Sequence, residues 1–149
     1  MFLLRRLKQN LEEHVVVPAQ IEGPVAGVQP RTILVVEDEV LIRMMISDAL
    51  RSRGLIVIET ATAEEALVVL QSDRAIDVLL SDVHLPGTMN GLALAAWTRE
   101  HRPDLKIVIA TSYVEPATEG DVDAVFHKPY DVDEMGECVT NLVAQTHGH

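Results

Sequence analysis

The spacing of hydrophobic residues divides this chain into short apolar runs separated by amphipathic stretches. The runs are rich in β-branched residues, which favour strands, and they fall at residues 32–36, 55–58, 78–80, 107–110 and 124–126. Strands that are apolar almost throughout and alternate with helices are typical of a parallel sheet with both faces covered. The pattern therefore predicts an α/β fold, in which a doubly wound five-stranded parallel sheet carries helices on both faces.

The amphipathic stretches predict core-facing helices. In the first, apolar residues recur at positions i, i+3, i+4, i+7 and i+8, namely Ile42, Met45, Ile46, Ala49 and Leu50. A capping box formed by Thr62 and Glu65 starts the second helix. The third follows Gly91 and is expected to face the core with Leu92, Ala95 and Ala96. The last follows the cap residue Asp131, and its predicted core face is Met135, Cys138, Val139, Leu142 and Val143.

Residues 1–31 have no sustained period and contain scattered proline and glycine, which is typical of a linker. Leu3, Leu4, Leu7 and Leu11 nevertheless recur at helical spacing with basic residues between them. This stretch is either an unstructured terminus or a short amphipathic helix that docks on a protein or a membrane surface. We expect a tail at 1–31, one domain at 32–146 and a short tail at 147–149.

Composition excludes several classes of function. A formal net charge of −11, with only three lysines, argues against binding to nucleic acid. No apolar run approaches the ~20 residues of a membrane-spanning helix, and the first ten residues do not resemble a secretory signal. The single cysteine, Cys138, allows no intrachain disulfide and fits a reducing cytoplasm.

Chemically distinctive residues follow four of the predicted strands. Glu37, Asp38 and Glu39 follow the first strand and Asp82 follows the third. Thr111 and Ser112 follow the fourth strand, and Lys128 and Pro129 follow the fifth. In doubly wound sheets the working site lies at the carboxyl ends of the strands, so these side chains are expected to meet at one edge.

These groups suit phosphoryl transfer onto a carboxylate. Because the donor is anionic, a divalent cation is needed, and Mg²⁺ prefers hard oxygen ligands. Glu37, Asp38, Asp82 and the backbone carbonyl of His84 are the candidate ligands. The Thr111 hydroxyl and the Lys128 ammonium are candidate partners of the transferred group. Without metal, at least one of the clustered carboxylates is expected to have a raised pKa.

Each of these residues alone has an ordinary explanation as a surface charge or a strand-end hydroxyl. Their joint occurrence at four strand ends is what favours a site. The segments that carry them are ILVVEDE, DVLLSDVHLPG, IVIATS and FHKPYD. Over residues 32–145 these segments resemble, in order and spacing, the motifs of response-regulator receiver domains of two-component signalling.

The resemblance implies a flavodoxin-like sheet with strand order 2-1-3-4-5. It also implies Asp82 as phosphoacceptor, Glu37 and Asp38 as the acidic metal pair, Thr111 as switch hydroxyl and Lys128 as phosphoryl partner. A cis peptide bond before Pro129 is a further implication.

The chain departs from the family pattern in three places. The loop at 86–91 looks one residue longer than usual, and residues 112–122 leave room only for a reduced fourth helix. Val125 occupies the position that usually carries an aromatic ring, with Phe126 next to it. The usual coupling between hydroxyl and ring is therefore in doubt.

The leading hypothesis is a stand-alone, cytoplasmic signalling switch rather than an enzyme. It would receive its phosphoryl group from a histidine kinase or a histidine phosphotransfer protein and act through protein contacts, with no output module after the last helix. One alternative is a small Mg²⁺-dependent phosphatase or phosphotransferase that uses an aspartyl-phosphate. Another is a scaffold that works unphosphorylated and tolerates Asp82→Asn.

Overall fold

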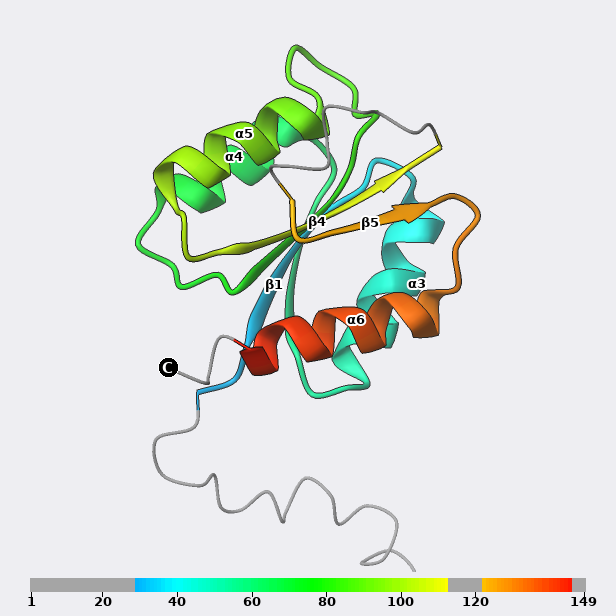
Figure 1. Ribbon diagram of the computed structural model, residues 1–149. Helices are drawn as coiled ribbons and strands as arrows, with labels where there is room; N and C mark the ends of the chain where they lie inside the picture. The colour runs from blue at the N-terminus through cyan, green and yellow to red at the C-terminus, as the bar shows by residue number, and fades with distance from the viewer. Residues whose placement is uncertain (1–28, 113–121, 146–149) are drawn as a thin grey trace, which may run out of the picture.

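The computed structural model describes residues 29–112 and 122–145 and contains a five-stranded parallel sheet with the order β2-β1-β3-β4-β5 (Figure 1). Its strands are β1 (Thr32–Val36), β2 (Ile56–Thr60), β3 (Val78–Asp82), β4 (Lys106–Thr111) and β5 (Ala124–His127). This confirms the α/β class and the flavodoxin-like strand order. Each predicted strand exists; the first has the predicted bounds, and the ends of the others differ by at most two residues.

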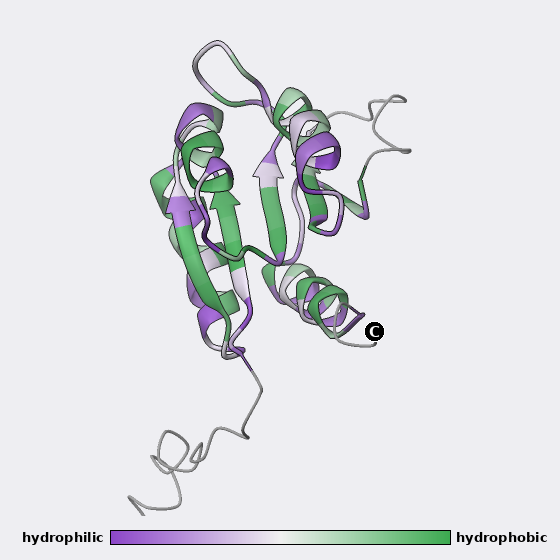
Figure 2. Cartoon of the chain, turned by 90° about the vertical axis from the view of Figure 1, so that its left-hand side faces the viewer, coloured by the Kyte–Doolittle hydropathy of each residue, from purple (hydrophilic) through white to green (hydrophobic). Residues whose placement is uncertain are grey.

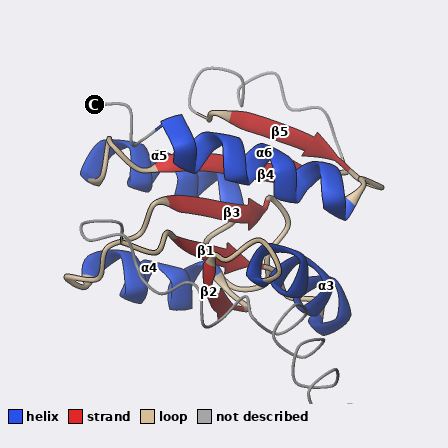
Figure 3. Ribbon diagram, turned by 90° about the horizontal axis from the view of Figure 1, so that it is seen from below, coloured by secondary structure: helices blue, strands red, loops and turns tan. Residues whose placement is uncertain are grey.

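Two helices cover each face of the sheet, as Figures 1 and 3 show. On one face lie α3 (Val40–Arg51) and α6 (Val132–Gln145). On the other lie α4 (Ala63–Gln71) and α5 (Gly91–His101). The described helices thus complete the three-layered, doubly wound arrangement that the alternating pattern predicted.

The central strand β1 explains why the sheet has two cores. Successive strand residues point to opposite faces, so Ile33 and Val35 pack under α3 and α6. Leu34 and Val36 pack under α4 and α5. Figure 2 shows that the strands are mainly hydrophobic, whereas the helices carry both hydrophobic and hydrophilic residues. The edge strands β2 and β5 are only partly buried.

Local capping signals in the sequence are confirmed. The Thr62 hydroxyl accepts a hydrogen bond from the backbone N–H of Glu65 at 3.1 Å, and the Glu65 carboxylate accepts one from Ala61 at 3.0 Å. Asp131 accepts from the N–H groups of Asp133 and Glu134. These contacts satisfy amide groups that the first turn of a helix leaves unpaired.

Two predicted core positions are wrong. Met45 on α3 is 58 % exposed, and Ala96 on α5 is exposed. In α5 the buried face is instead Gly91, Leu94, Ala95 and Thr98. The helical period was correct. The period alone does not fix how the helix is rotated about its axis against the sheet, and the buried face can differ by about one residue.

The aromatic ring next to Val125 belongs to the core. Phe126 packs against the cluster under α3 and α6, and its ring meets that of Tyr130 edge-on at 6.2 Å between centroids. Val125 is partly buried.

Three sequence-based expectations fall largely or wholly outside the described residues. These are the linker with its possible amphipathic helix, the reduced fourth helix in the segment 112–122, and the tail at 147–149. Within the described ranges, no helix is long and apolar enough to cross a membrane.

Candidate functional site

Parallel register brings the strand ends to one edge of the sheet. Val36 of β1 pairs with Ser81 of β3, and Asp82 pairs with Ala110 of β4. Glu37 therefore follows β1 directly beside the end of β3, and Thr111 ends β4 one residue beyond the partner of Asp82. The predicted strand-end residues thus share one rim.

Three carboxylates meet at this rim. Glu37, Asp38 and Asp82 each offer an oxygen, and these oxygens lie within 4.8 Å of one another. Glu37 and Asp82 are buried, with exposed fractions of 2 % and 7 %, whereas Asp38 is exposed. Two acidic groups are thus held in place by the fold, and the third lies at the entrance.

Lys128 supplies the positive charge. Its ammonium donates to the Asp82 carboxylate at 2.7 Å and lies 3.4 Å from Glu37. Its backbone N–H donates to the carbonyl of Thr111 at 2.9 Å, and its peptide bond to Pro129 is cis, as the resemblance implied. Burial alone lowers the pKa of Lys128, but the hydrogen bond and charge of Asp82, with the charge of Glu37, raise it overall.

Excess negative charge persists despite this lysine. Burial, followed by the charge of Asp82, raises the pKa of Glu37 to about 7, and Lys128 offsets the increase only in part. The expectation that a clustered carboxylate has a raised pKa is confirmed. A site with surplus negative charge and hard oxygen donors suits Mg²⁺, so the residues present fit the predicted ion.

Thr111 and His84 border the acceptor in different ways. Thr111 is 1 % exposed at the end of β4. The backbone N–H of His84 donates to the Asp82 carboxylate at 3.1 Å, which fixes the carboxylate from the side of the loop. The metal role of the His84 carbonyl and the phosphoryl role of Thr111 stay predictions.

The loop between β3 and α5 is held by residues that the sequence analysis did not assign to the site. The N–H of Gly91 donates to the carbonyl of Val83, and a Cβ at position 91 would clash with the backbone carbonyl oxygen of Asp82. One carboxylate oxygen of Glu64 accepts hydrogen bonds from the N–H and hydroxyl of Thr88 and from the N–H of Met89. Neither contact has a local sequence signal, because the partners are separated along the chain.

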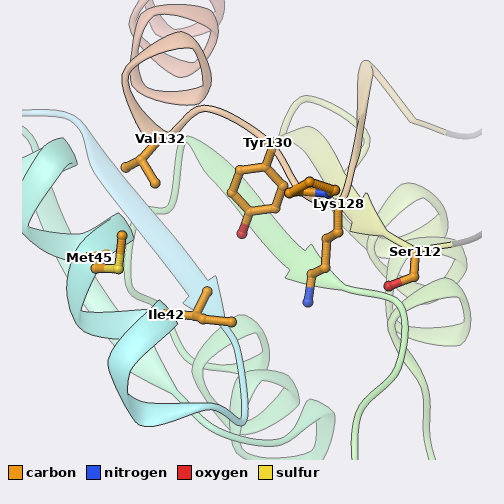
Figure 4. Close-up of a pocket in the computed structure, with 7 residues that line it drawn as sticks. Ile42, Met45, Ser112, Lys128, Tyr130 and Val132 are labelled. Atoms are coloured by element: carbon orange, nitrogen blue, oxygen red, sulfur yellow. The ribbon is translucent and has the colours of Figure 1, made fainter.

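An apolar pocket of about 470 Å³ adjoins the rim (Figure 4). It is lined by Ile42, Met45, Ser112, Lys128, Pro129, Tyr130 and Val132. The Tyr130 hydroxyl is buried and has no hydrogen-bond partner among the described residues, and burial raises its pKa to about 12. The sequence analysis missed this pocket, since its walls come from three separate segments.

Comparison with known proteins places these observations in a family. Residues 33–140 match the family model described as the response regulator receiver domain. The chain is 34 % identical over 118 residues to the sensor kinase CckA of Brucella abortus. It is also 34 % identical over 115 residues to the DNA-binding transcriptional regulator NtrC of Salmonella typhimurium.

These alignments cover 75 % and 74 % of this chain but only 12 % and 24 % of the two relatives. The sporulation initiation phosphotransferase F of Bacillus subtilis is matched over 89 % of its length, at 26 % identity over 72 % of this chain.

Solved structures agree with the fold. A response regulator protein, TrrA from Thermotoga maritima in complex with Mg²⁺-BeF, has a TM-score of 0.68 and 29 % identity, over 75 % of this chain and 98 % of that one. A CheY-like receiver domain protein from Methanospirillum hungatei has a TM-score of 0.73 at 24 % identity, over 80 % and 98 % of the two chains. The second similarity concerns the fold alone.

Proposed function

Because this chain belongs to the response regulator receiver domain family, we propose that it is a phosphoacceptor switch of two-component signalling, phosphorylated on Asp82. The observation that carries the proposal is the position of Asp82. Its carboxylate lies 2.7 Å from the Lys128 ammonium and shares a 4.8 Å cluster of oxygens with Glu37 and Asp38.

The residues divide the chemistry between them. A carboxylate oxygen of Asp82 attacks the phosphorus of a phosphohistidine, a P–O bond forms as the P–N bond breaks, and the imidazole nitrogen of the donor keeps the electron pair. Lys128 then exchanges part of its contact with the carboxylate for a phosphoryl oxygen, and the Thr111 hydroxyl donates to another. The Asp82 carboxylate is held for this attack by the His84 N–H.

Glu37, Asp38 and Asp82 are the residues that would hold Mg²⁺, with the His84 carbonyl as a further ligand. When bound there, the ion supplies positive charge that offsets the repulsion between the carboxylate and the anionic donor. The raised pKa of Glu37, caused first by burial and then by the charge of Asp82, supports this assignment, because a cation bound there would favour the ionised carboxylate.

A histidine kinase or histidine phosphotransfer protein is the proposed donor, and the proposed readout is contact with another protein rather than with nucleic acid. The free thiol of Cys138 and the net charge of −11 are consistent with a cytoplasmic protein of this kind.

The test distinguishes a switch from an enzyme. The chain is incubated with phosphoramidate, whose P–N bond imitates phosphohistidine, with Mg²⁺ or with EDTA. We expect up to one phosphoryl group per chain with Mg²⁺ and a far lower yield with EDTA. Continued turnover of p-nitrophenyl phosphate, many equivalents per chain, would instead identify a phosphatase and contradict the proposal.

A further inference from the structure

The first turns of α3 carry an exposed apolar surface next to the site. Val40, Leu41, Met44 and Met45 are 55 %, 74 %, 50 % and 58 % exposed. Among the described residues only two other large hydrophobic side chains are exposed, Ile56 and Val68, and both lie on other elements. A cluster of this kind marks an interaction surface more often than scattered exposure does.

This surface continues into the pocket beside the acceptor. Figure 4 shows Ile42 and Met45 on the α3 side, facing Tyr130 and Val132 across the opening. Met45 belongs both to the exposed set and to the pocket lining, so we treat the four exposed residues together with Ile42, Tyr130 and Val132 as one surface, which we call the α3 groove. Its apolar side chains match the requirements of aliphatic side chains from a short amphipathic segment.

The rim of the α3 groove is acidic. Asp38 and Glu39, which immediately precede the helix, are both exposed. The nearby cations are already engaged, since the Lys128 ammonium contacts Asp82 and Glu37, and Arg43 lies 3.5 Å from Glu59. An occupant with apolar and basic residues would therefore match the groove in both character and charge.

Such a segment is present in the same chain. Residues 2–11 contain five large apolar residues, three basic residues and no acidic one. The apolar residues are Phe2, Leu3, Leu4, Leu7 and Leu11, and the basic ones are Arg5, Arg6 and Lys8. This combination is the complement of the groove, and the phosphoacceptor chemistry makes no use of it.

The chain is long enough for the two to meet. Arg31, whose side chain pairs with Asp77 at 2.9 Å, fixes the chain at the opposite edge of the sheet, next to the start of β1. The groove lies beyond the length of this five-residue strand, about 17 Å. The 19 residues from Glu12 to Pro30 can span up to about 60 Å when extended.

We propose that residues 2–11 of this chain bind its own α3 groove, next to Asp82. The leucines occupy the apolar wall, and the arginines face the acidic rim. The bound segment competes with any protein that brings a phosphoryl group to the same rim. The binding itself requires neither phosphate nor metal, so it can be tested apart from the phosphoacceptor function.

Methionine methyl groups provide the test, because two of the five methionines, Met44 and Met45, lie in the α3 groove. Methyl-labelled full-length chain is compared by NMR with Leu4→Glu/Leu7→Glu and with the matched control Val15→Glu/Val17→Glu. Met135 is 1 % exposed in the core and reports whether the fold is intact. We expect the Met44 and Met45 signals to shift in the leucine variant and to stay in place in the control.

Three results would overturn the proposal. One is unchanged Met44 and Met45 signals in the leucine variant. Another is wild-type signals that change on dilution, which would assign the groove to a second copy. The third is wild-type signals that match those of the leucine variant until anionic vesicles are added, which would assign the segment to a membrane. If the Met135 signal also shifts, the core is disturbed. The milder Leu4→Ala/Leu7→Ala variant then replaces the leucine variant, and the same changes at Met44 and Met45 are expected.

Discussion

Glu37 lies in an environment very different from that of a free carboxyl side chain. It is 2 % exposed and lies beside Asp82, and the nearby ammonium of Lys128 compensates only part of the repulsion. Without a metal, ionisation of Glu37 is therefore less favourable in the folded protein than in the unfolded chain. This single residue links the stability of the fold to the electrostatics of the site.

We predict that the metal-free protein loses stability as pH rises. The pKa of Glu37 increases from 4.5 when unfolded to about 7 when folded, so the folded state binds more protons between these values. The contribution is fully present below the unfolded pKa and is lost as pH rises through the folded pKa. Denaturant unfolding from about pH 4.5 to about pH 8 measures it. Glu37→Gln should flatten this dependence, and an unaltered slope in that variant would contradict the assignment.

Lys128 is predicted to stabilise the fold and to weaken metal binding. Lys128→Met removes the hydrogen bond to Asp82 and should lower the free energy of unfolding by about 1–3 kcal/mol near neutral pH. The same change should increase affinity for Mg²⁺, because a competing cation is gone. Calorimetric titration and denaturant unfolding measure the two effects. Lys106→Met, at the start of β4, is the matched control and should leave metal affinity unchanged.

At the scale of elements, the start of α5 is locked to the end of β3. A methyl group at position 91 would clash with the backbone carbonyl of Asp82, which cannot move without shifting the acceptor. At Gly136 in α6 the atoms nearest to the same methyl group all belong to the flexible side chain of Arg53. These two glycines therefore form a natural pair for comparison.

We predict that Gly91→Ala destabilises the protein by about 2 kcal/mol or more, because the overpacked strand end must shift. Gly136→Ala should stay within about 1 kcal/mol of wild type, since the intrinsic helix propensity of alanine compensates for moving a flexible arginine. Thermal or denaturant unfolding gives both values. Equal effects in the two variants would show that the close approach at Asp82 is unimportant.

The loop after β3 is predicted to depend on Glu64. Its own backbone N–H, then the Thr88 hydroxyl and the N–H groups of the loop, lower the pKa of this carboxyl group and keep it an acceptor. Glu64→Ala should speed amide hydrogen exchange at Thr88 and Met89 relative to wild type. Glu64→Gln retains an acceptor oxygen and should restore much of the protection. Identical exchange in all three proteins would exclude the contact as a restraint.

The presence of each helix and strand, and the caps of the helices, could be predicted because their signals are local in the sequence. Thr62 and Asp131 lie within three residues of the amide groups that they cap. The exposure of Met45 and the bond between Glu64 and Thr88 could not be predicted in this way. They depend on helix rotation and on contacts between residues 24 positions apart, which periodicity does not encode.

At the scale of the whole molecule, the site is a product of topology. Parallel strands with the order β2-β1-β3-β4-β5 bring Glu37, Asp82, Thr111 and Lys128 from separate parts of the chain to one rim. Their juxtaposition could be predicted from the sequence because parallel strands end together. The adjoining α3 groove could not, since it depends on how helix and loop surfaces meet.

The central claim is that this rim makes Asp82 the phosphoacceptor. The most direct test is the intact mass of the protein after incubation with acetyl phosphate and Mg²⁺, for wild type, Asp82→Asn and the exposed control Asp73→Asn. We predict that wild type and Asp73→Asn gain the mass of one phosphoryl group, and that Asp82→Asn gains none. The same gain of mass in Asp82→Asn as in wild type would contradict the account.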